Sequence, residues 1–101
     1  MSYRLTEQAF ADLIDLTQYG IEKFGQPAAE KYHLALTRTF ELLADLPAIG
    51  RDAPDHPGHR RFWHGRHVIY YREEDAGIVI ARLLHVAMDA ASHPIDPGNE
   101  E

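Results

Sequence analysis

The chain has 101 residues, of which 45% are hydrophobic and 26% charged, with a formal net charge of −6 and no cysteine. This length suits one compact domain, and the composition is that of a soluble globular protein rather than a disordered chain or a membrane span. The lack of cysteine excludes disulfides, thiolate nucleophiles and cysteine zinc sites. The N-terminus lacks the basic region and long apolar stretch of a secretory signal, so we expect a cytoplasmic protein.

Two amphipathic helices are expected in the first half of the chain. Thr6 can cap the first helix and Gly25 can end it. Its apolar residues recur at steps of three and four and are expected to form one face: Phe10, Leu13, Ile14, Thr17, Ile21 and Phe24. Pro27 suits the first turn of the second helix. The apolar stripe of that helix is Ala29, Tyr32, Leu36, Phe40, Leu43 and Leu46. The short connection predicts an antiparallel helical hairpin that faces a sheet.

A short strand is expected before the first helix, over residues 3–5. Residues 47–58 hold three prolines and two glycines, which predicts a connecting loop. Three strands rich in β-branched and aromatic residues are then expected at 61–64, 66–72 and 78–86. The order β-α-α-β-β-β predicts an α+β fold in which the helical hairpin packs on a small antiparallel sheet.

The strands alternate between two faces of this predicted sheet. Val68 and Tyr70 fall on one face of the middle strand, and Ile69 and Tyr71 on the other. In the last strand, regular alternation puts Ile78, Ile80, Arg82 and Leu84 on the same side. We expect a single domain over residues 1–91. The acidic segment 92–101, with two prolines, is expected to be flexible unless a partner orders it.

Positive charge is concentrated in one segment of this acidic chain. Residues 56–72 hold four arginines and four histidines and no acidic residue. Such a face attracts an anionic ligand or an acidic peptide, while the acidic remainder of the chain resists indiscriminate binding to nucleic acid. The alternative is an ordinary solvated strand surface.

An ordered series of short motifs spans nearly the whole chain. It comprises Ala11-Asp12-Leu13, Leu46-Pro47, Ile49-Gly50-Arg51, Pro57-Gly58 with Arg60, Gly65-Arg66-His67-Val68-Ile69-Tyr70-Tyr71-Arg72, Gly77-Ile78, Ile80, Arg82-Leu83-Leu84-His85 and Met88-Asp89. With this series the chain resembles the RelE/ParE toxins, and most of all the ParE branch. These are the toxin halves of bacterial type II toxin-antitoxin modules. The resemblance implies a small antiparallel sheet packed on a helical hairpin, which agrees with the element order read from the residues.

The resemblance leaves two kinds of activity open. RelE-like toxins are ribosome-dependent ribonucleases, and RNA cleavage needs a positioned acid or base and cations at the phosphate. Such toxins typically carry an arginine beyond the last strand and a tyrosine or histidine near the C-terminus. Here Val86, Ala87 and Met88 follow His85, so the expected arginine and aromatic residue are missing, and only His85 and His93 could act as a late proton donor or acceptor. We therefore expect no catalytic residues, with His85, Arg60 and Arg82 as the weaker ribonuclease alternative.

ParE-like toxins are similar in fold but bind DNA gyrase and trap its cleaved-DNA intermediate, which requires a binding surface and no cofactor. The residues expected to bind a partner are of the types that concentrate energy at interfaces: Arg60, Trp63, Arg66, Tyr71, Arg72 and Arg82. A structural role is the alternative for each of them. The aromatic rings would cover the helices, and Arg82 would pair with a neighbouring carboxylate.

The resemblance also implies a second partner, a cognate ParD-like antitoxin whose C-terminal segment wraps the toxin. That segment would lay apolar residues between helix and sheet edge and acidic residues on the arginine-rich strands. No sequence-specific DNA binding by this chain alone is expected. A third possibility is a binding module that keeps the fold and the antitoxin but has lost its toxicity.

Four histidines, His56, His59, His64 and His67, raise the question of a metal site. Cysteine and acidic ligands are absent among them, and they divide between a loop and a turn. We therefore predict no metal site and expect these side chains to face solvent or to be hydrogen-bonded.

Overall fold

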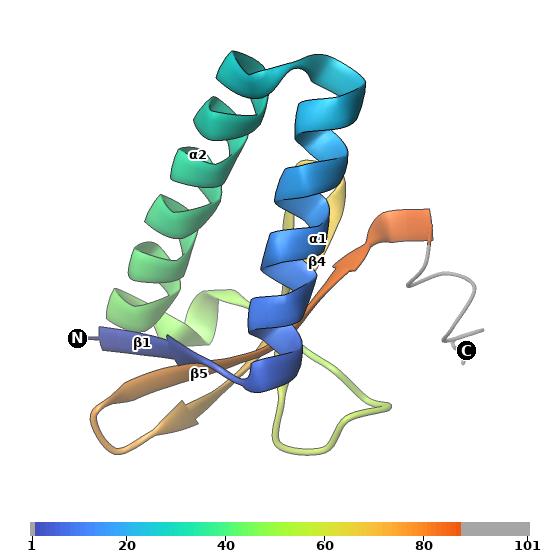
Figure 1. Ribbon diagram of the computed structural model, residues 1–101. Coiled ribbons are helices and arrows are strands. Elements are labelled where there is room, and N and C mark those ends of the chain that lie inside the picture. Colours follow the sequence, from blue (N-terminus) through green and yellow to red (C-terminus); the bar gives the residue numbers. More distant parts are fainter. Residues whose placement is uncertain (1, 88–101) are drawn as a thin grey trace.

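The structure, a computed structural model, describes residues 2–87 of the chain and consists of two layers (Figure 1). One layer is a helical hairpin of α1 (Glu7–Phe24) and α2 (Gln26–Asp45). The other is a five-stranded sheet of β1 (Ser2–Leu5), β2 (Arg51–Asp52), β3 (Arg60–His64), β4 (His67–Glu74) and β5 (Gly77–His85). The strand order is β1-β5-β4-β3-β2, and both helices cover the same face of the sheet.

The helix boundaries follow from their capping residues. The Thr6 Oγ1 accepts a hydrogen bond from the Ala9 N–H at 3.0 Å, as a capping threonine should. Gly25 ends α1 with φ at +90°, a conformation that costs glycine little, and Pro27 stands in the first turn of α2. The predicted hairpin is therefore confirmed.

The sheet is mixed rather than purely antiparallel, so that part of the prediction is wrong. The strands β2 to β5 pair antiparallel, but β1 runs parallel to β5, with Ser2 opposite Gly77 and Leu5 opposite Ile80. The helical hairpin is long enough to carry the chain across the sheet, so β1 can lie along the outer edge of β5 in the same direction. In that position the Tyr3 ring packs edge-on against Phe40 at 5.3 Å between centroids.

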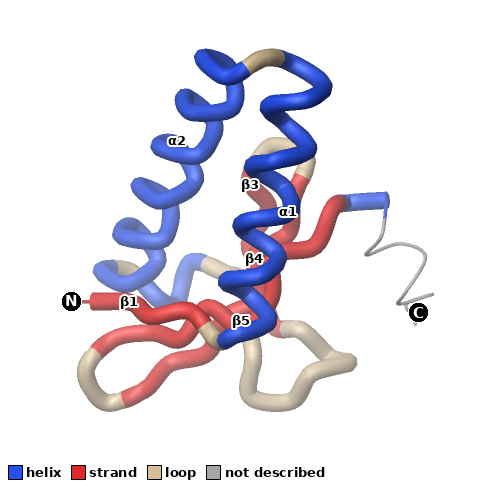
Figure 2. Tube along the Cα trace, in the orientation of Figure 1, coloured by secondary structure: helices blue, strands red, loops and turns tan. Residues whose placement is uncertain are grey.

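The segment predicted as a loop between α2 and β3 contains regular structure. A 3₁₀-helix spans Pro47–Ile49, and β2 then pairs with the start of β3. Figure 2 shows the remaining residues to β3 as a loop below the sheet. Two residues are too short to give an alternation pattern, which explains why the sequence did not indicate this strand.

A bulge in β5 changes which side chains face the helices. Tyr70 is opposite Arg82 and Tyr71 is opposite Ile80, so Ala81 is the extra residue. Ile78 and Ile80 therefore share the helix-facing core with Leu83, whereas Leu84 lies in a second cluster on the outer face of the sheet. The expectation that Leu84 shares a face with Ile78 is wrong because it assumed unbroken alternation.

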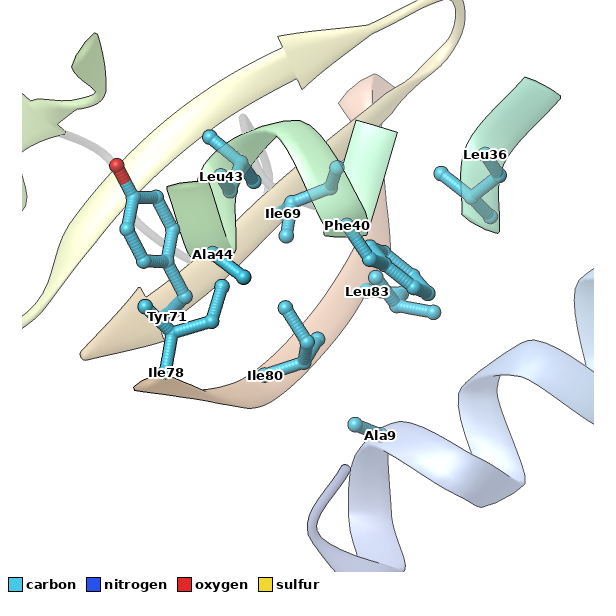
Figure 3. Close-up of a cluster of buried hydrophobic side chains, with 10 residues drawn as sticks. All are labelled: Ala9, Leu36, Phe40, Leu43, Ala44, Ile69, Tyr71, Ile78, Ile80 and Leu83. Atoms are coloured by element: carbon cyan, nitrogen blue, oxygen red, sulfur yellow. The ribbon is translucent and has the colours of Figure 1, made fainter. Parts of the chain in front are cut away.

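The main core lies between α2 and the helix-facing side of β4 and β5 (Figure 3). It consists of Ala9, Leu36, Phe40, Leu43, Ala44, Ile69, Tyr71, Ile78, Ile80 and Leu83. In α2 the predicted stripe is confirmed except at Leu46, which is 52% exposed. Leu46 follows the helix and leads into the 3₁₀ turn, so it no longer lies on the buried stripe.

In α1 the predicted face is rotated from the one that packs. Phe10 and Phe24 are 57% and 60% exposed. The inward side carries Ala9, which is fully buried, and Leu16, neither of which belongs to the predicted face, together with Leu13, which does belong to it. Small residues allow the two helices to approach closely, since Gly20 faces Ala29 at their crossing. Four large apolar residues of the predicted face remain exposed: Phe10, Ile14, Ile21 and Phe24.

Two of the sequence-based expectations fall partly outside the described residues. These are the domain boundary at residue 91 and the acidic tail at 92–101. Within residues 2–87, neither helix combines the length and apolar character needed to span a bilayer.

Candidate functional site

Tyr71 belongs to the core and not to the surface. Its side chain is fully buried, and its hydroxyl donates to the Pro47 carbonyl at 2.6 Å and accepts from the Gly50 N–H at 3.0 Å. Burial raises the pKa of this phenol. The expectation that Tyr71 is exposed to a partner is therefore wrong, because the ring holds the segment after α2 against the sheet.

Arg60 is engaged within the chain. Its Nη1 donates to the Gly50 carbonyl at 3.1 Å, and its guanidinium lies 3.7 Å from the carboxylates of both Asp52 and Glu73. These contacts link β2, β3 and β4 at one end of the sheet. A direct contact of Arg60 with a partner stays a prediction.

Arg82 forms the best-defined ion pair among the described residues. Its Nε and Nη2 donate to the two carboxylate oxygens of Asp12 at 2.8 and 3.2 Å. Asp12 also accepts from the Leu83 N–H at 2.9 Å, so one carboxylate ties α1 to β5 beside the bulge. The hydrogen bond to Asp12 raises the pKa of Arg82. Pairing with a neighbouring carboxylate, the alternative role considered for Arg82, is confirmed.

The other predicted partner-binding residues, Trp63, Arg66 and Arg72, are at least partly accessible. Trp63 is 45% exposed, Arg66 is exposed in the turn between β3 and β4, and Arg72 is half-buried on β4. Within residues 2–87, neither Arg66 nor Arg72 has a side-chain hydrogen bond or ion pair. Their role at an interface stays a prediction.

Two arginines that were not among the predicted binding residues, Arg51 and Arg61, lie on the same face of the sheet as Trp63. Arg51 on β2 is directly opposite Arg61 on β3, and the Arg61 guanidinium lies 5.2 Å from the centre of the Trp63 ring. Arg61 and Trp63 stand two residues apart in one strand, so their shared face could be read from the sequence. The pairing with Arg51 could not, because β2 was not predicted.

A groove opens between α1, the start of α2 and the end of the sheet at which β4 begins and β5 ends. Its volume is about 930 Å³, and its apolar lining includes Leu16, Tyr19, Phe24 and Leu83. Lys23 and Arg66 supply positive charge in the same lining, and Asp12 and Asp15 supply negative charge, with Asp12 paired to Arg82. The groove depends on how α1 is rotated over the sheet, which the apolar pattern of α1 did not indicate.

A hydrogen-bonded group of rings closes one end of this groove. The Tyr32 hydroxyl donates to the His64 carbonyl at 3.0 Å and lies 2.7 Å from His67 Nδ1. The His67 and His85 rings pack edge-on at 5.5 Å between centroids. Burial, with smaller contributions from His85 and His64, lowers the pKa of His67 to about 4. His67 is therefore neutral at neutral pH.

The three residues of the ribonuclease alternative do not converge. His85 is opposite His67, and His67 is opposite His64, at the end of β3 away from Arg60. Arg60 is four positions from His64 along β3, a distance of about 13 Å. Arg82 is held by Asp12. This arrangement does not bring an acid or base together with two phosphate-binding cations. His93 lies outside the described residues.

The four histidines considered as metal ligands form two separate pairs. The His56 and His59 rings lie 6.3 Å apart in the loop before β3, and His56 packs on Tyr70. His64 and His67 belong to the ring group around Tyr32, and His64 Nδ1 lies 2.9 Å from Thr39 Oγ1. No group of three or more candidate ligands that could hold a metal occurs within residues 2–87.

Comparison with known proteins adds to this geometry. The model of a family described as the ParE toxin of the type II toxin-antitoxin system parDE matches residues 3–90. The chain belongs to this family. It is 37% identical over 92 residues to a toxin ParE1 of Caulobacter vibrioides, covering 90% of this chain and 95% of the relative. A toxin ParE1 of Mycobacterium tuberculosis is 32% identical over 89 residues, covering 86% and 91%.

A solved structure supports the fold of this ParE family member. A chain of the chromosomal ParDE toxin-antitoxin system from P. aeruginosa superposes with a TM-score of 0.71 at 23% identity, covering 84% of this chain and 95% of that chain. The predicted α+β architecture is therefore confirmed, with the mixed sheet as the one correction to it.

Proposed function

We propose that this ParE toxin stops growth in the cytoplasm by binding DNA gyrase and trapping the enzyme on cleaved DNA. The observation that supports this proposal most directly is that residues 3–90 match the ParE toxin family. Inhibition of this kind needs a specific surface rather than a catalytic centre. The separation of His85 from Arg60, and the pairing of Arg82 with Asp12, favour this mode over ribonuclease activity.

The surface available for a target is smaller than the sequence indicated. Tyr71 is buried, and Arg60 and Arg82 hold the fold together. Trp63, Arg66 and Arg72 remain as candidate target contacts, and exposed tryptophan and arginine are the residue types most enriched at energetic centres of interfaces.

We further propose that a ParD-like antitoxin neutralises the toxin by filling the groove beside α1. Its apolar lining offers pockets for an amphipathic helix or an extended segment, and Lys23 and Arg66 would attract acidic side chains. Arg66→Glu should then weaken antitoxin binding in low salt, whereas Arg38→Glu, an exposed arginine of α2 outside the groove lining, should have little effect. Unchanged affinity of Arg66→Glu would contradict this placement.

A cleavage-complex assay tests the gyrase proposal. The purified toxin is incubated with gyrase, ATP and supercoiled plasmid, and the products are treated with detergent and protease. Linear plasmid that appears only with the toxin, and that the cognate antitoxin suppresses, is the expected result. Arg72→Glu should reduce the linear product and Arg38→Glu should not.

Two other outcomes would reject gyrase as the target. Toxicity with intact plasmid, together with cleavage of ribosome-bound mRNA, would establish the ribonuclease alternative. Harmless expression with retained antitoxin binding would indicate a binding module without toxicity.

A further inference from the structure

The outer face of the sheet, away from the helices, carries a group of three arginines and one tryptophan that the proposed groove does not use. We call it the outer arginine patch: Arg51, Arg61, Trp63 and Arg72. The register places Arg51 opposite Arg61, Arg61 opposite Tyr70 and Trp63 opposite Val68. Arg72 follows Tyr70 by two residues in β4 and therefore shares this face.

Like charges stand directly across from each other in this patch. Arg51 and Arg61 are cross-strand partners, an arrangement that destabilises a sheet unless an anion relieves it. The Arg61 Nε is buried and has no hydrogen-bond partner in the part of the chain that the structure describes. The like-charge pair points to a ligand that supplies negative charge, and the unpaired Nε shows that the described residues give this atom of Arg61 no compensating acceptor.

Neighbouring carboxylates are engaged by arginines outside the patch. Asp52 and Glu73 lie beside Arg60, which is opposite Tyr71 and therefore on the helix-facing side. Glu74 accepts two hydrogen bonds from Arg4. Glu74 also interacts electrostatically with Arg72, so these carboxylates neutralise the patch only in part. The net charge of −6 weakens long-range attraction of an anion.

The indole of Trp63 adds an aromatic surface to these cations. It is 45% exposed, with the Arg61 guanidinium 5.2 Å from the ring centre. Arginines next to an exposed ring form the combination that binds single-stranded nucleic acid, because phosphates contact the cations while a base stacks on the ring. An acidic peptide would pair with the arginines but would need a separate apolar side chain for the indole.

We propose that the outer arginine patch binds a short single-stranded segment of DNA without regard to its sequence. The arginines would contact consecutive phosphates, and one base would stack on Trp63. The choice of DNA over RNA rests on the proposed function, since a gyrase cleavage complex contains opened DNA. The phosphate and base contacts themselves follow from the patch alone.

Trp63 is the single tryptophan of the chain, so its fluorescence reports directly on this site. The full-length protein is titrated with a ten-nucleotide oligothymidylate in about 20 mM salt. We expect quenching that saturates and that weakens steeply with salt. For three phosphate contacts the logarithm of the affinity should fall with a slope of about −2 against the logarithm of the salt concentration.

Matched variants decide whether the patch is responsible. Arg51→Gln and Arg72→Gln should each weaken binding about ten-fold in this buffer and reduce the salt slope by about 0.7. Arg38→Gln removes the same charge from an exposed site on α2 and should bind as the unmodified protein does. Thermal melting monitored by circular dichroism establishes that each variant is folded.

Several outcomes would overturn the proposal. They are no saturable quenching at low salt, equal loss of binding in Arg38→Gln, equally tight binding of polyaspartate, and at least ten-fold preference for oligouridylate over oligothymidylate. The plasmid cleavage assay is scored separately. A protein that binds oligothymidylate but yields no linear plasmid supports the patch and rejects only the gyrase target.

Discussion

The Asp12 carboxylate receives three donors from β5: two from the Arg82 guanidinium, at 2.8 and 3.2 Å, and the Leu83 N–H at 2.9 Å. Asp12 and Arg82 are 70 residues apart in the chain, so this contact closes a long loop between α1 and β5. It lies next to the extra residue Ala81, where the strand changes its alternation. The ion pair therefore fixes the position of α1 over the bulge.

Removing this carboxylate should destabilise the fold. Asp12→Ala leaves the partly buried Arg82 guanidinium and the Leu83 N–H without an acceptor, which we expect to cost about 2 kcal/mol. Urea unfolding monitored by circular dichroism measures the change. Asp15→Ala is the matched control, because Asp15 is exposed on the same helix and makes no hydrogen bond or ion pair among the described residues. Equal losses in the two variants would contradict a structural role for the pair.

The hydroxyl of Tyr71 should contribute separately to stability. Tyr71→Phe keeps the buried ring but removes the acceptor of the Gly50 N–H and the donor to the Pro47 carbonyl. We expect a loss of about 1 to 2 kcal/mol, since a buried N–H is left unpaired. Tyr19→Phe, on a 57% exposed ring, should change the unfolding free energy by less than about 0.5 kcal/mol. A neutral Tyr71→Phe would mean that water replaces the hydroxyl.

Features set by local sequence were predictable, and features set by distant contacts were not. Thr6, Gly25 and Pro27 define the helix ends through their own backbone and side-chain chemistry, and all three were recognised. The parallel pairing of β1 with β5 joins residues about 75 positions apart, and no local pattern encodes it. The bulge at Ala81 is likewise a property of the β4 and β5 pair, not of either strand alone.

The candidate site shows the same division. Residue type alone made Tyr71 and Trp63 equivalent candidates, although one proves fully buried and the other 45% exposed. Arg60 and Arg82 were indistinguishable from Arg66 until their acceptors were known. Burial and hydrogen bonding decide which arginines are available to a partner, and both depend on the folded chain.

Substitutions on α1 can test which side of this helix packs. Leu16 packs against the core although it lies outside the predicted face, so Leu16→Ala should cost about 2 kcal/mol. Phe10 is 57% exposed, and Phe10→Gln should cost less than about 0.5 kcal/mol in the free toxin. Chemical denaturation of both variants makes the comparison. The reverse order of costs would restore the helix face that the apolar pattern indicated.

Stability should fall in mild acid because of His67. The pKa of His67 is lowered from 6.5 to about 4, first by burial and then by His85 and His64. Above pH 6.5 the imidazole is neutral in both the folded and unfolded states, so it has no effect on the pH dependence. Between pH 6.5 and 4 the unfolded chain binds a proton that the folded chain does not, and stability decreases as pH falls. Because His67 is only partly buried, solvent screening reduces the full loss below the value that this shift alone gives, to about 2 to 3 kcal/mol.

The measurement compares urea unfolding at pH 7, 6 and 5 for the unmodified protein and for His67→Gln. Carboxylates also titrate toward the acid end of this range, but they are common to both proteins, so the difference between the two curves isolates His67. We expect His67→Gln to have the flatter pH dependence between pH 7 and 5. Identical slopes in the two proteins would show that His67 titrates equally in the folded and unfolded states, and burial would then not keep the imidazole neutral.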